Sequence, residues 1–585
     1  MRVVLDAPAQ AEPLDKRAVL CRQLRFIRPD TDDEVAIVSG YSSSYDGGQG
    51  TFVWNSQSTT SIDEGIVFGS GPLGRWRRVW DQRTVNVNWF GVDRTGVLDV
   101  TIQMRRAIAA CPVGGIVQLG NGTHSVTSQL TCSAHMTIQG MMAGSGGGTH
   151  SISTLIRYDG PTNLAVTASI IAMKGGSTLK DLRVGISAGR RMYAGIGFNG
   201  PETITTPTAV LFERVGVEGF AGTPSASGSM DYGWTIGVSG STGNFENIIW
   251  ERCQVLQTMR AGVLVQTGQP FNLEMRHMVF ANYGLTSGLF PGSGSFSFGT
   301  AVQWSSNSEP VFGALTMNNP VFSYVAEAIN FRYVCNFMSI RDADAEGLLR
   351  LITKELSGLS VDTGPINVVG GRYVPTALGT PAYRQDGTVH IPAEDHRFIV
   401  NRWGSPLNMV GVNMSVGAGA FSGSRNLHIE VGDNTPVNLT GCSFDTPDPV
   451  RRLNTFDLPN GGTHVHGCRY WTTGSYVTLR VPERDGSDCW PFLWVHTGTS
   501  RTGSVTLPKT ELGTGKSFVG GGFTDYDVWM HPVGHTGSPP DGAFRTHVRS
   551  GSLKTTSFDA LFDEAPGVGN TVTFNVRIGL RSLWP

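Results

Sequence analysis

A six-residue phrase recurs ten times between residues 179 and 470, and it constrains the fold more than any other feature of the chain. Its first, fourth and sixth places are mostly apolar, and its third place is Asp, Asn, Gly, Arg or His. The copies begin at Leu179, Phe212, Trp250, Met275, Met317, Ile340, Val368, Met409, Leu439 and Val465. Apolar places with period two around a turn residue predict two short strands joined by a bend.

The copies start 23 to 42 residues apart, which is too irregular for a helical repeat but typical of a coil whose corners accept insertions. We therefore expect a solenoid, and because its unit is strand, bend, strand, an all-β fold built on a right-handed parallel β-helix. The clearest helical segment is Thr101 to Ala110. Asp99 is placed to cap its first turn, and Ile102, Ile108 and Ala109 are expected to face the same way.

The composition agrees with a turn-rich β protein. Glycine accounts for 76 of 585 residues, and charged residues for 16%, against roughly 25% in typical domains. The net charge of −2 with interspersed signs provides no basic stripe, so we expect no nucleic-acid partner. Met1 to Arg17 lacks the apolar core of a signal peptide, and no apolar run reaches the ~18 residues of a membrane span. We expect synthesis in a cytoplasm and no membrane insertion.

The eight cysteines show neither a CxxC pair nor zinc-site spacing. Cys253, Cys442 and Cys468 each follow a predicted bend directly, at a place that should face inward. We interpret them as stacked, reduced core residues, although the same register also permits a disulfide between Cys442 and Cys468.

The chain separates into four regions. Residues 1–20 form a polar arm, and residues 21–83 contain short strands between Gly and Asp turns, which predicts a small β module. Residues 84–475 hold the coil, with a capping helix near 101–110. Residues 476–585 lack the phrase and show alternating stretches typical of a β-sandwich or an interwoven terminal domain.

A series of short motifs leads into the coil: Gly40-Tyr41, Asp46-Gly47-Gly48, Gly50 to Trp54, Asp63-Glu64-Gly65, Gly74 to Arg78, Trp89-Phe90-Gly91, Asp99-Val100-Thr101 and Gly122-Thr123-His124. Over roughly residues 20–145 this series resembles the start of the pectate-lyase-type β-helix tailspikes of tailed bacteriophages, and the rest of the coil is similar in architecture. Val92 and Arg94-Thr95 depart from the family pattern, which more often has a small residue and an Asp-Gly there. The departures bear on chemistry and not on the fold.

The resemblance implies a homotrimer on the phage virion, synthesised in the host cytoplasm. It implies attachment through the N-terminal region to tail, baseplate or portal-adaptor proteins, and a C-terminal domain for trimerisation or glycan contact. It also implies binding, and in many members cleavage, of a bacterial surface polysaccharide. No metal or organic cofactor is required.

The densest group of carboxylates lies in the middle of the coil, at Asp342, Asp344 and Glu346. Because Ala343 and Ala345 match inward places, the three acids are expected to point outward in one row. Neighbours on one face of a strand lie roughly 6 to 7 Å apart, which suits the paired carboxyls of a retaining or an inverting glycosidase. The alternative is that Asp342 only makes the turn and the other acids bond to backbone.

Other acids compete with this row. Glu327, in the preceding rung, and Asp362, in the following one, are each placed to face it. A second set, Asp386, Glu394 and Asp395, lies in the long insertion from Tyr373 to Gly404. Long loops on rigid scaffolds often carry function, but solvated surface charge is the alternative for all five.

Aromatic residues in insertions are candidates for sugar binding, because a ring face stacks on pyranose C–H groups. Tyr232 and Trp234 lie in one insertion and Trp304 ends another. We take these three, with Arg341 beside the acids, as candidate substrate contacts. Packing of the loops against the coil is the alternative.

On the resemblance and the acid row together, we predict a tailspike that binds a surface polysaccharide and hydrolyses it with Asp342, Asp344 and Glu346, with Glu327 and Arg341 nearby. A polysaccharide lyase is a variant, in which Arg332, Tyr333 or Arg350 supports proton abstraction from an acidic sugar. The alternative from another class is a receptor-binding tail fibre or adhesin that binds without cleavage. A secreted plant-polysaccharide enzyme is a weaker interpretation.

Overall fold

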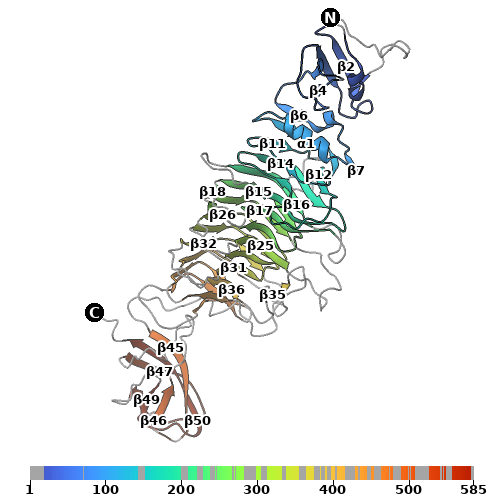
Figure 1. Ribbon diagram of the computed structural model, residues 1–585. Coiled ribbons are helices and arrows are strands. Elements are labelled where there is room, and N and C mark those ends of the chain that lie inside the picture. Colours follow the sequence, from blue (N-terminus) through green and yellow to red (C-terminus); the bar gives the residue numbers. More distant parts are fainter. Residues whose placement is uncertain are drawn as a thin grey trace. The chain divides into compact units, whose positions relative to one another are not determined.

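The computed structural model describes residues 19–580 apart from a set of excluded segments (Figure 1). The excluded residues are 30, 70, 143–151, 199–208, 220–227, 238–243, 246, 267–268, 271, 282–297, 305–312, 332–336, 355–363, 375–381, 384–388, 392–396, 402–404, 415–427, 433–434, 445–449, 453–462, 473–474, 479–488, 499, 501, 507–525, 541–542, 544–545 and 549–556. The chain divides into two compact units. Unit 1 is Met1–Cys335 with Pro381–Pro392, and unit 2 is Asn336–Thr380 with Ala393–Pro585.

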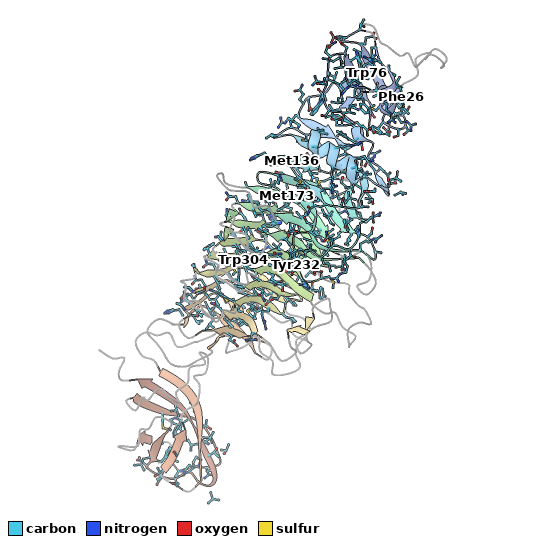
Figure 2. All side chains as sticks on the ribbon, in the orientation of Figure 1. Phe26, Trp76, Met136, Met173, Tyr232 and Trp304 are labelled. Atoms are coloured by element: carbon cyan, nitrogen blue, oxygen red, sulfur yellow. The ribbon has the colours of Figure 1, made fainter. Side chains whose placement is uncertain are left out.

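A small sheet opens the described part of unit 1, as the sequence predicts. Its strand order is β1-β2-β3-β5-β4, in which β1 and β2 are parallel and the other pairs are antiparallel. The elements are β1 (Val19–Leu20), the 3-10 helix η1 (Cys21–Phe26), β2 (Val35–Gly40), β3 (Gly50–Asn55), β4 (Val67–Phe68) and β5 (Arg75–Arg78). Its core contains Trp54 and Trp76, whose ring centroids lie 5.5 Å apart; Figure 2 shows Trp76 in this module.

Arg78 joins the module to the start of the coil. Its guanidinium lies 4.5 Å from the ring centroid of Phe52, in the module, and 4.6 Å from that of Trp89, in the 3-10 helix η2 (Val87–Phe90) of the coil. It also donates to the carbonyl oxygens of Gly48 and Gln49, both at 2.9 Å. Burial lowers the pKa of Arg78 to about 10. Because buried carbonyls and ring faces replace its water, the cation fastens the two parts to each other.

The cap of the coil consists of β6 (Thr84–Asn86), η2, β7 (Thr95–Asp99) and α1 (Thr101–Ala110). The bounds of α1 are those predicted, and Asp99 Oδ1 accepts a hydrogen bond of 2.9 Å from the Thr101 backbone N–H. The predicted face of this helix is wrong, because Ile102 is 61% exposed and Ala109 is exposed too. Met104, Ala107 and Ile108 are the apolar side chains that α1 buries. These positions share one face at 3.6 residues per turn, whereas Ile102 lies on another.

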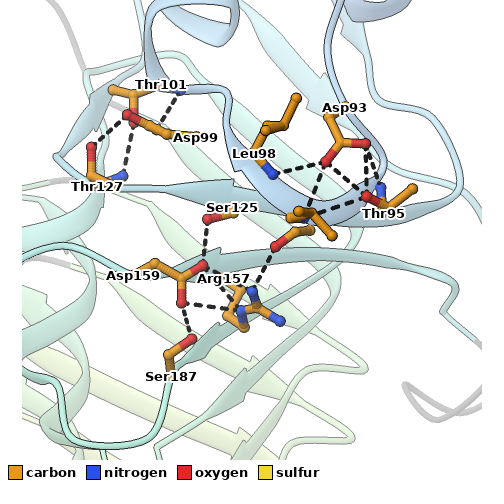
Figure 3. A network of polar contacts seen from close by, with 12 residues as sticks. Asp93, Thr95, Leu98, Asp99, Thr101, Ser125, Thr127, Arg157, Asp159 and Ser187 are labelled. Carbon is orange, nitrogen blue, oxygen red and sulfur yellow. Dashed lines mark hydrogen bonds and ion pairs between the residues drawn. The ribbon is translucent and has the colours of Figure 1, made fainter.

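Polar contacts fasten the first rungs beneath this cap (Figure 3). Asp159 accepts hydrogen bonds from the hydroxyls of Ser125 and Ser187 and from Arg157 Nη2, the last at 2.9 Å. Arg157 Nη2 also donates to the carbonyl of Gly96 at 2.8 Å. Burial raises the pKa of Asp159, but these hydrogen bonds outweigh it and hold the pKa below its usual value. This carboxylate therefore has a structural role.

In unit 1 the coil is formed by two sheets of parallel strands. The first, which we call the bend sheet, contains β6, β7, β8 (Ile116–Gln118), β9 (Gly122–Val126), β11 (Thr137–Gln139), β12 (Thr154–Tyr158), β14 (Thr178–Ile186), β16 (Val210–Glu218), β19 (Ile248–Glu251), β20 (Gln254–Leu256), β23 (Leu273–Arg276), β24 (Val279–Ala281), β26 (Ala314–Asn318) and β27 (Val321–Ser323). The second contains β10 (Leu130–Thr131), β13 (Ser169–Ala172), β15 (Arg191–Phe198), β17 (Ser229–Ile236), β21 (Ala261–Val265), β25 (Phe298–Trp304) and β28 (Val325–Phe331). Short pairs outside this path are β18 (Asn244–Phe245) with β22 (Gln269–Pro270), and β34 (Ala382–Tyr383) with β35 (Val389–Ile391).

Unit 2 repeats the arrangement. Its bend-sheet strands are β29 (Phe337–Arg341), β30 (Asp344–Glu346), β32 (Ile366–Val369), β33 (Arg372–Val374), β37 (Leu407–Val410), β39 (Val437–Thr440) and β42 (Thr463–His466), and β40 (Ser443–Phe444), β43 (Arg469–Thr472) and β44 (Ser475–Thr478) form a short sheet. Its second-sheet strands are β31 (Arg350–Lys354), β36 (Arg397–Asn401), β38 (His428–Val431) and β41 (Val450–Arg452). The strands that form the coil in both units are parallel, which confirms the predicted parallel β-helix.

All ten third places of the phrase are bends, as predicted, and the structure shows that they are left-handed. Their φ angles lie between 50° and 65°. The bend residues are Asp181, Arg214, Arg252, His277 and Asn319 in unit 1, and Asp342, Gly370, Gly411, Gly441 and Gly467 in unit 2. The first places stack in register on the inward side: Leu179, Phe212, Trp250, Met275 and Met317 in unit 1, and Ile340, Val368, Met409, Leu439 and Val465 in unit 2. Cys253, Cys442 and Cys468 are buried free thiols, which agrees with their predicted inward place.

The C-terminal region contains two antiparallel sheets of three strands. One has the order β45-β50-β47 and the other β46-β49-β48. The strands are β45 (Cys489–Gly498), β46 (Thr502–Thr506), β47 (Tyr526–Thr536), β48 (Thr546–Val548), β49 (Ser557–Phe562) and β50 (Gly567–Leu580). Phe562 of one sheet and Phe574 of the other lie 5.4 Å apart between ring centroids, so the sheets pack face to face. The boundaries at residues 20, 83 and 475 stay predictions.

A glycine-to-alanine change at a bend tests the left-handed constraint. We expect Gly441→Ala to lower the free energy of unfolding by about 1–2 kcal/mol, because its Cβ is disfavoured at φ 61° although no atom lies within 4 Å. Gly441→Asn should cost less, since Asn tolerates this region. The measurement is chemical denaturation of both variants, with Thr440→Ala, an exposed neighbour, as control. Equal losses for the Ala and Asn variants would contradict the explanation.

His124 makes stability depend on pH. Its side chain is fully buried in β9, where Nε2 donates to the Gly120 carbonyl at 3.0 Å, and burial lowers its pKa. The unfolded chain therefore takes up a proton that the folded chain refuses, so stability should fall below roughly pH 6.5, by up to about 1.4 kcal/mol per pH unit. We expect His124→Leu to reduce this slope in unfolding midpoints measured over about pH 5 to 8. His535→Leu, at an exposed position, should leave the slope unchanged.

Candidate functional site

The acid row lies on β29 and β30, around the bend at Asp342. Ala343 and Ala345 are buried, whereas Asp342, Asp344 and Glu346 are exposed. The outward direction of the three carboxylates is therefore as predicted, and it follows from the period of two along a strand. Their role in catalysis stays a prediction.

The following rung supplies the immediate surroundings of the acids. The register pairs Asp344 of β30 with Arg372 of β33, whose side chain is exposed. A Cβ atom at Gly370 would come within 2.2 Å of Asp342 Oδ1, so glycine at this bend leaves room for the carboxylate. Arg341 is also exposed, and its Nε donates to Ser339 Oγ at 3.3 Å. Exposed carboxyls among guanidinium groups can exchange protons with a sugar and also orient it.

Three outward rows run along unit 2 from the acids. The amide row is Asn367, Asn408 and Asn438, in which each Nδ2 donates to the preceding Oδ1, at 2.9 Å for Asn408 and 2.7 Å for Asn438. The second-place row is Arg341, Val369, Val410, Thr440 and His466. The fifth-place row is Asp344, Arg372, Asn413, Ser443 and Arg469, in which Ser443 is buried and Asn413 half-buried. Sequence reasoning missed these rows, although the second and fifth places of the phrase mark two of them.

Glu327 does not belong to this surface. It lies on β28 in the second sheet of unit 1, and its side chain is fully buried. Its Oε2 accepts hydrogen bonds from Thr300 Oγ1 at 3.2 Å and from Asn330 Nδ2 at 2.8 Å. The prediction that Glu327 faces the acid row is therefore wrong, because the side chain is buried in unit 1, where it accepts hydrogen bonds from Thr300 and Asn330.

The predicted aromatic contacts are core residues. Tyr232 and Trp234 belong to β17, and Trp304 ends β25. Their side chains are 5%, 1% and 0% exposed, and Figure 2 shows Tyr232 and Trp304 within the coil. Trp234 packs 5.9 Å from Phe212 and Trp304 5.7 Å from Phe331, measured between ring centroids. This burial contradicts their predicted contact with substrate. The segments interpreted as insertions contain buried strands, which glycine-rich flanks obscured in the sequence.

Of the residues named for the lyase variant and for the rival acid sets other than Glu327, only Arg350 lies within the described part of the chain. Arg350 is buried, and its Nη1 donates to Thr353 Oγ1 at 3.4 Å. Arg332, Tyr333, Asp362, Asp386, Glu394 and Asp395 lie outside the described residues.

A second charged cluster, in unit 1, was not predicted. Asp231 of β17 is nearly buried and interacts with Arg191 at 3.1 Å and with Arg260 at 3.5 Å. On β15 and β17, the ring centroids of Tyr193 and Tyr232 lie 5.1 Å apart, and burial raises the pKa of Tyr193. Only the position of Asp231 beside Tyr232 pointed to it in the sequence. Because both oxygens of Asp231 interact with arginines, we interpret the cluster as a cross-rung ion pair.

Within the described ranges, no group of three or more His, Cys, Asp or Glu side chains could hold a metal ion. In the same part of the chain, no helix is both long and apolar enough to cross a membrane.

Residues 21–81 match the family model of the phage tail protein small four-stranded beta-sheet domain. The match covers β2 to β5 and leaves out β1, the parallel fifth strand. This bears out the predicted resemblance of the module to phage tail proteins. No curated protein matches the chain.

Several solved structures are similar to the chain at low identity. The tailspike protein gp49 from Acinetobacter baumannii bacteriophage Fri1, a capsular polysaccharide depolymerase, has a TM-score of 0.41 and 11% identity and covers 97% of this chain and 98% of its own. Tailspike protein 2 from Escherichia coli O157:H7 bacteriophage CAB120 has a TM-score of 0.47 and 13% identity over 97% and 72%. The catalytic unit of the GH87 alpha-1,3-glucanase from Streptomyces thermodiastaticus has a TM-score of 0.37 and 16% identity over 68% and 73%.

Trp304 provides a test of the corrected role of the aromatic residues. We expect Trp304→Ala to lower the free energy of unfolding by about 3–5 kcal/mol, because it opens a cavity against Phe331. Val495→Ala, at a half-exposed position of β45, should change it little. Denaturation followed by tryptophan fluorescence and circular dichroism measures both. Unchanged stability of the Trp304 variant would contradict its place in the core.

Proposed function

Because residues 21–81 match a domain of phage tail proteins and lead into a parallel β-helix, we propose that the chain is a tailspike, which binds and depolymerises a bacterial surface polysaccharide. The match of the module is the observation that carries the proposal. Buried Arg78 contacts both this module and the first turn of the coil. The place of action is the virion tail.

We assign the chemistry to the acid row. Hydrolysis of a glycosidic bond needs one carboxyl that protonates the leaving oxygen and a second that activates water or attacks the anomeric carbon. Asp342, Asp344 and Glu346 supply exposed carboxyls at adjacent outward places on one short segment. Parallel ladders to the next rung position the backbone that carries these carboxyls before substrate binds. Arg372, beside Asp344, is placed to orient the sugar.

We further propose that the chain forms a homotrimer and attaches to tail, baseplate or portal-adaptor proteins through its N-terminal region. Supporting association, the cap exposes a group of apolar side chains: Val97 is 80%, Leu98 63% and Ile102 61% exposed. Apolar groups of this kind on a surface are typical of sites where another protein packs. Light scattering on the purified protein measures the number of chains.

The test of the proposed hydrolysis is a comparison of variants on the surface polysaccharide of the host bacterium. We expect Asp342→Asn, Asp344→Asn and Glu346→Gln combined to lower the rate at which reducing ends appear by about 10²-fold or more, because the acid and base are removed. Binding of the polysaccharide should persist. Asp563→Asn with Glu564→Gln, an exposed acidic pair in the C-terminal region, is the matched control and should leave the rate unchanged.

The other outcomes separate the alternatives. Cleavage that survives the triple change rules out the acid row. Products that absorb as unsaturated sugars identify a lyase. Binding without cleavage by the unaltered protein identifies an adhesin, and the absence of both overturns the proposal.

A further inference from the structure

The bends of unit 2 change character after Asp342. The next four are Gly370, Gly411, Gly441 and Gly467, whereas the five bends at 181, 214, 252, 277 and 319 in unit 1 all carry side chains at nearly the same φ. The fold therefore does not demand glycine at this place. A Cβ atom at 411, 441 or 467 would meet no atom within 4 Å, so each of these bends has unoccupied space where a side chain would lie. We call these four glycines and the bend at Asp342 before them, together with their neighbours in the amide, second-place and fifth-place rows, the glycine strip.

The side chains along the glycine strip have a consistent chemistry. Val369 and Val410 beside the bends are 38% and 45% exposed, which gives the strip an apolar floor. No Asp or Glu occurs in the bend-sheet segments 366–374, 407–414, 437–444 and 463–470, all of which the structure describes. Among the side chains there that the structure describes, the exposed ionisable ones are Arg372, His464, His466 and Arg469. The strip is therefore acidic only at its beginning, at Asp342 and Asp344, and basic beyond.

Several polar groups of the strip are already held in position. Arg469 Nε donates to Ser443 Oγ at 2.9 Å, and the asparagines of the amide row are hydrogen-bonded to one another. Asn413 Oδ1, between Arg372 and Ser443 in the fifth-place row, is buried and has no hydrogen-bond partner among the described residues. Side chains ordered in advance lose less entropy when they bind a ligand.

We propose that the glycine strip is a binding track for a polysaccharide that carries anionic groups, with the bond to be cleaved at its Asp342 end. This inference rests on the proposed function and names the substrate class and the path of the chain. Rungs about 4.8 Å apart place Gly467 about 19 Å from Asp342, so the track is long enough for several sugars. Sugar C–H groups lie on the Val and Gly floor, hydroxyls meet the asparagines, and carboxylate or phosphate groups pair with Arg372 and Arg469.

Low backbone strain alone would also favour glycine at these bends, and a substitution separates the two explanations. Asn is suited to a left-handed bend, as Asn319 shows at φ 51°. Gly411→Asn and Gly441→Asn should therefore fold normally but place a side chain on the track. We expect each to raise KM for the host polysaccharide by about tenfold and to leave kcat within about twofold, the pattern of lost ground-state binding. His277→Gly, the reverse change at a bend of unit 1, should alter neither constant.

The charge of the ligand is tested in parallel. We expect Arg469→Gln to raise KM about tenfold and to weaken its dependence on salt, because one ion pair with the polysaccharide is lost. The complementary change is made in the ligand, by reducing its carboxyl groups or removing its phosphates. The unaltered protein should bind this polysaccharide as weakly as the Arg469→Gln variant binds the original one. Arg252→Gln, at a half-exposed bend of unit 1, is the matched control.

The outcomes distinguish this inference from the proposed function. If the unaltered protein cleaves the polysaccharide but the two Asn variants and Arg469→Gln keep its KM, the track is overturned and the tailspike assignment stands. If light scattering shows that the Asn variants dissociate into single chains, the strip is a contact between copies and the inference is also overturned. If the unaltered protein neither binds nor cleaves the polysaccharide, both proposals fail.

Discussion

The left-handed bend at the third place of each rung is the constraint on which the rest of the coil depends. Ten residues adopt it within a φ range of 50° to 65°, although the intervals between them vary from 23 to 42 residues. Because each bend fixes the direction of the strands before and after it, the first places of successive rungs form an inward stack within each unit. Insertions of any length can then be accepted at other corners without disturbing the core.

The same bends decide what the surface presents. In unit 1, bend side chains form ion pairs, such as Arg214 with Asp181 at 2.5 Å and Arg252 with Glu251 at 3.6 Å. These contacts accompany the left-handed strain of a residue with a Cβ atom. In unit 2 the bends from Gly370 onward are glycines, which have no Cβ atom. They therefore adopt the left-handed conformation without strain and place no side chain on the surface. One backbone geometry thus gives a charged, mutually paired edge in one unit and a bare one in the other.

The acid row and the aromatic residues show how far pattern alone extends to function. The outward direction of Asp342, Asp344 and Glu346 could be predicted, because alternation within one strand is a local property. The burial of Trp234, Trp304 and Glu327 could not, because it depends on strands that lie next to them in space and far from them in sequence. The prediction that Ile102 lies on the same face as Ile108 was wrong for a related reason. The sequence predicts the helix, but the neighbouring elements decide which of its faces is buried.

The sequence by itself determined the repeating unit, its bends, the inward stack, the capping helix 101–110 and the separate module before the coil, since turn chemistry and short-range periodicity encode all of them. Only the tertiary structure decided which outward residues become neighbours. The fifth-place row from Asp344 to Arg469 draws on five segments spread over 126 residues. Parallel pairing between rungs places successive members of this row one strand spacing apart. Because the insertions between rungs differ in length, the sequence alone does not show which residues are paired.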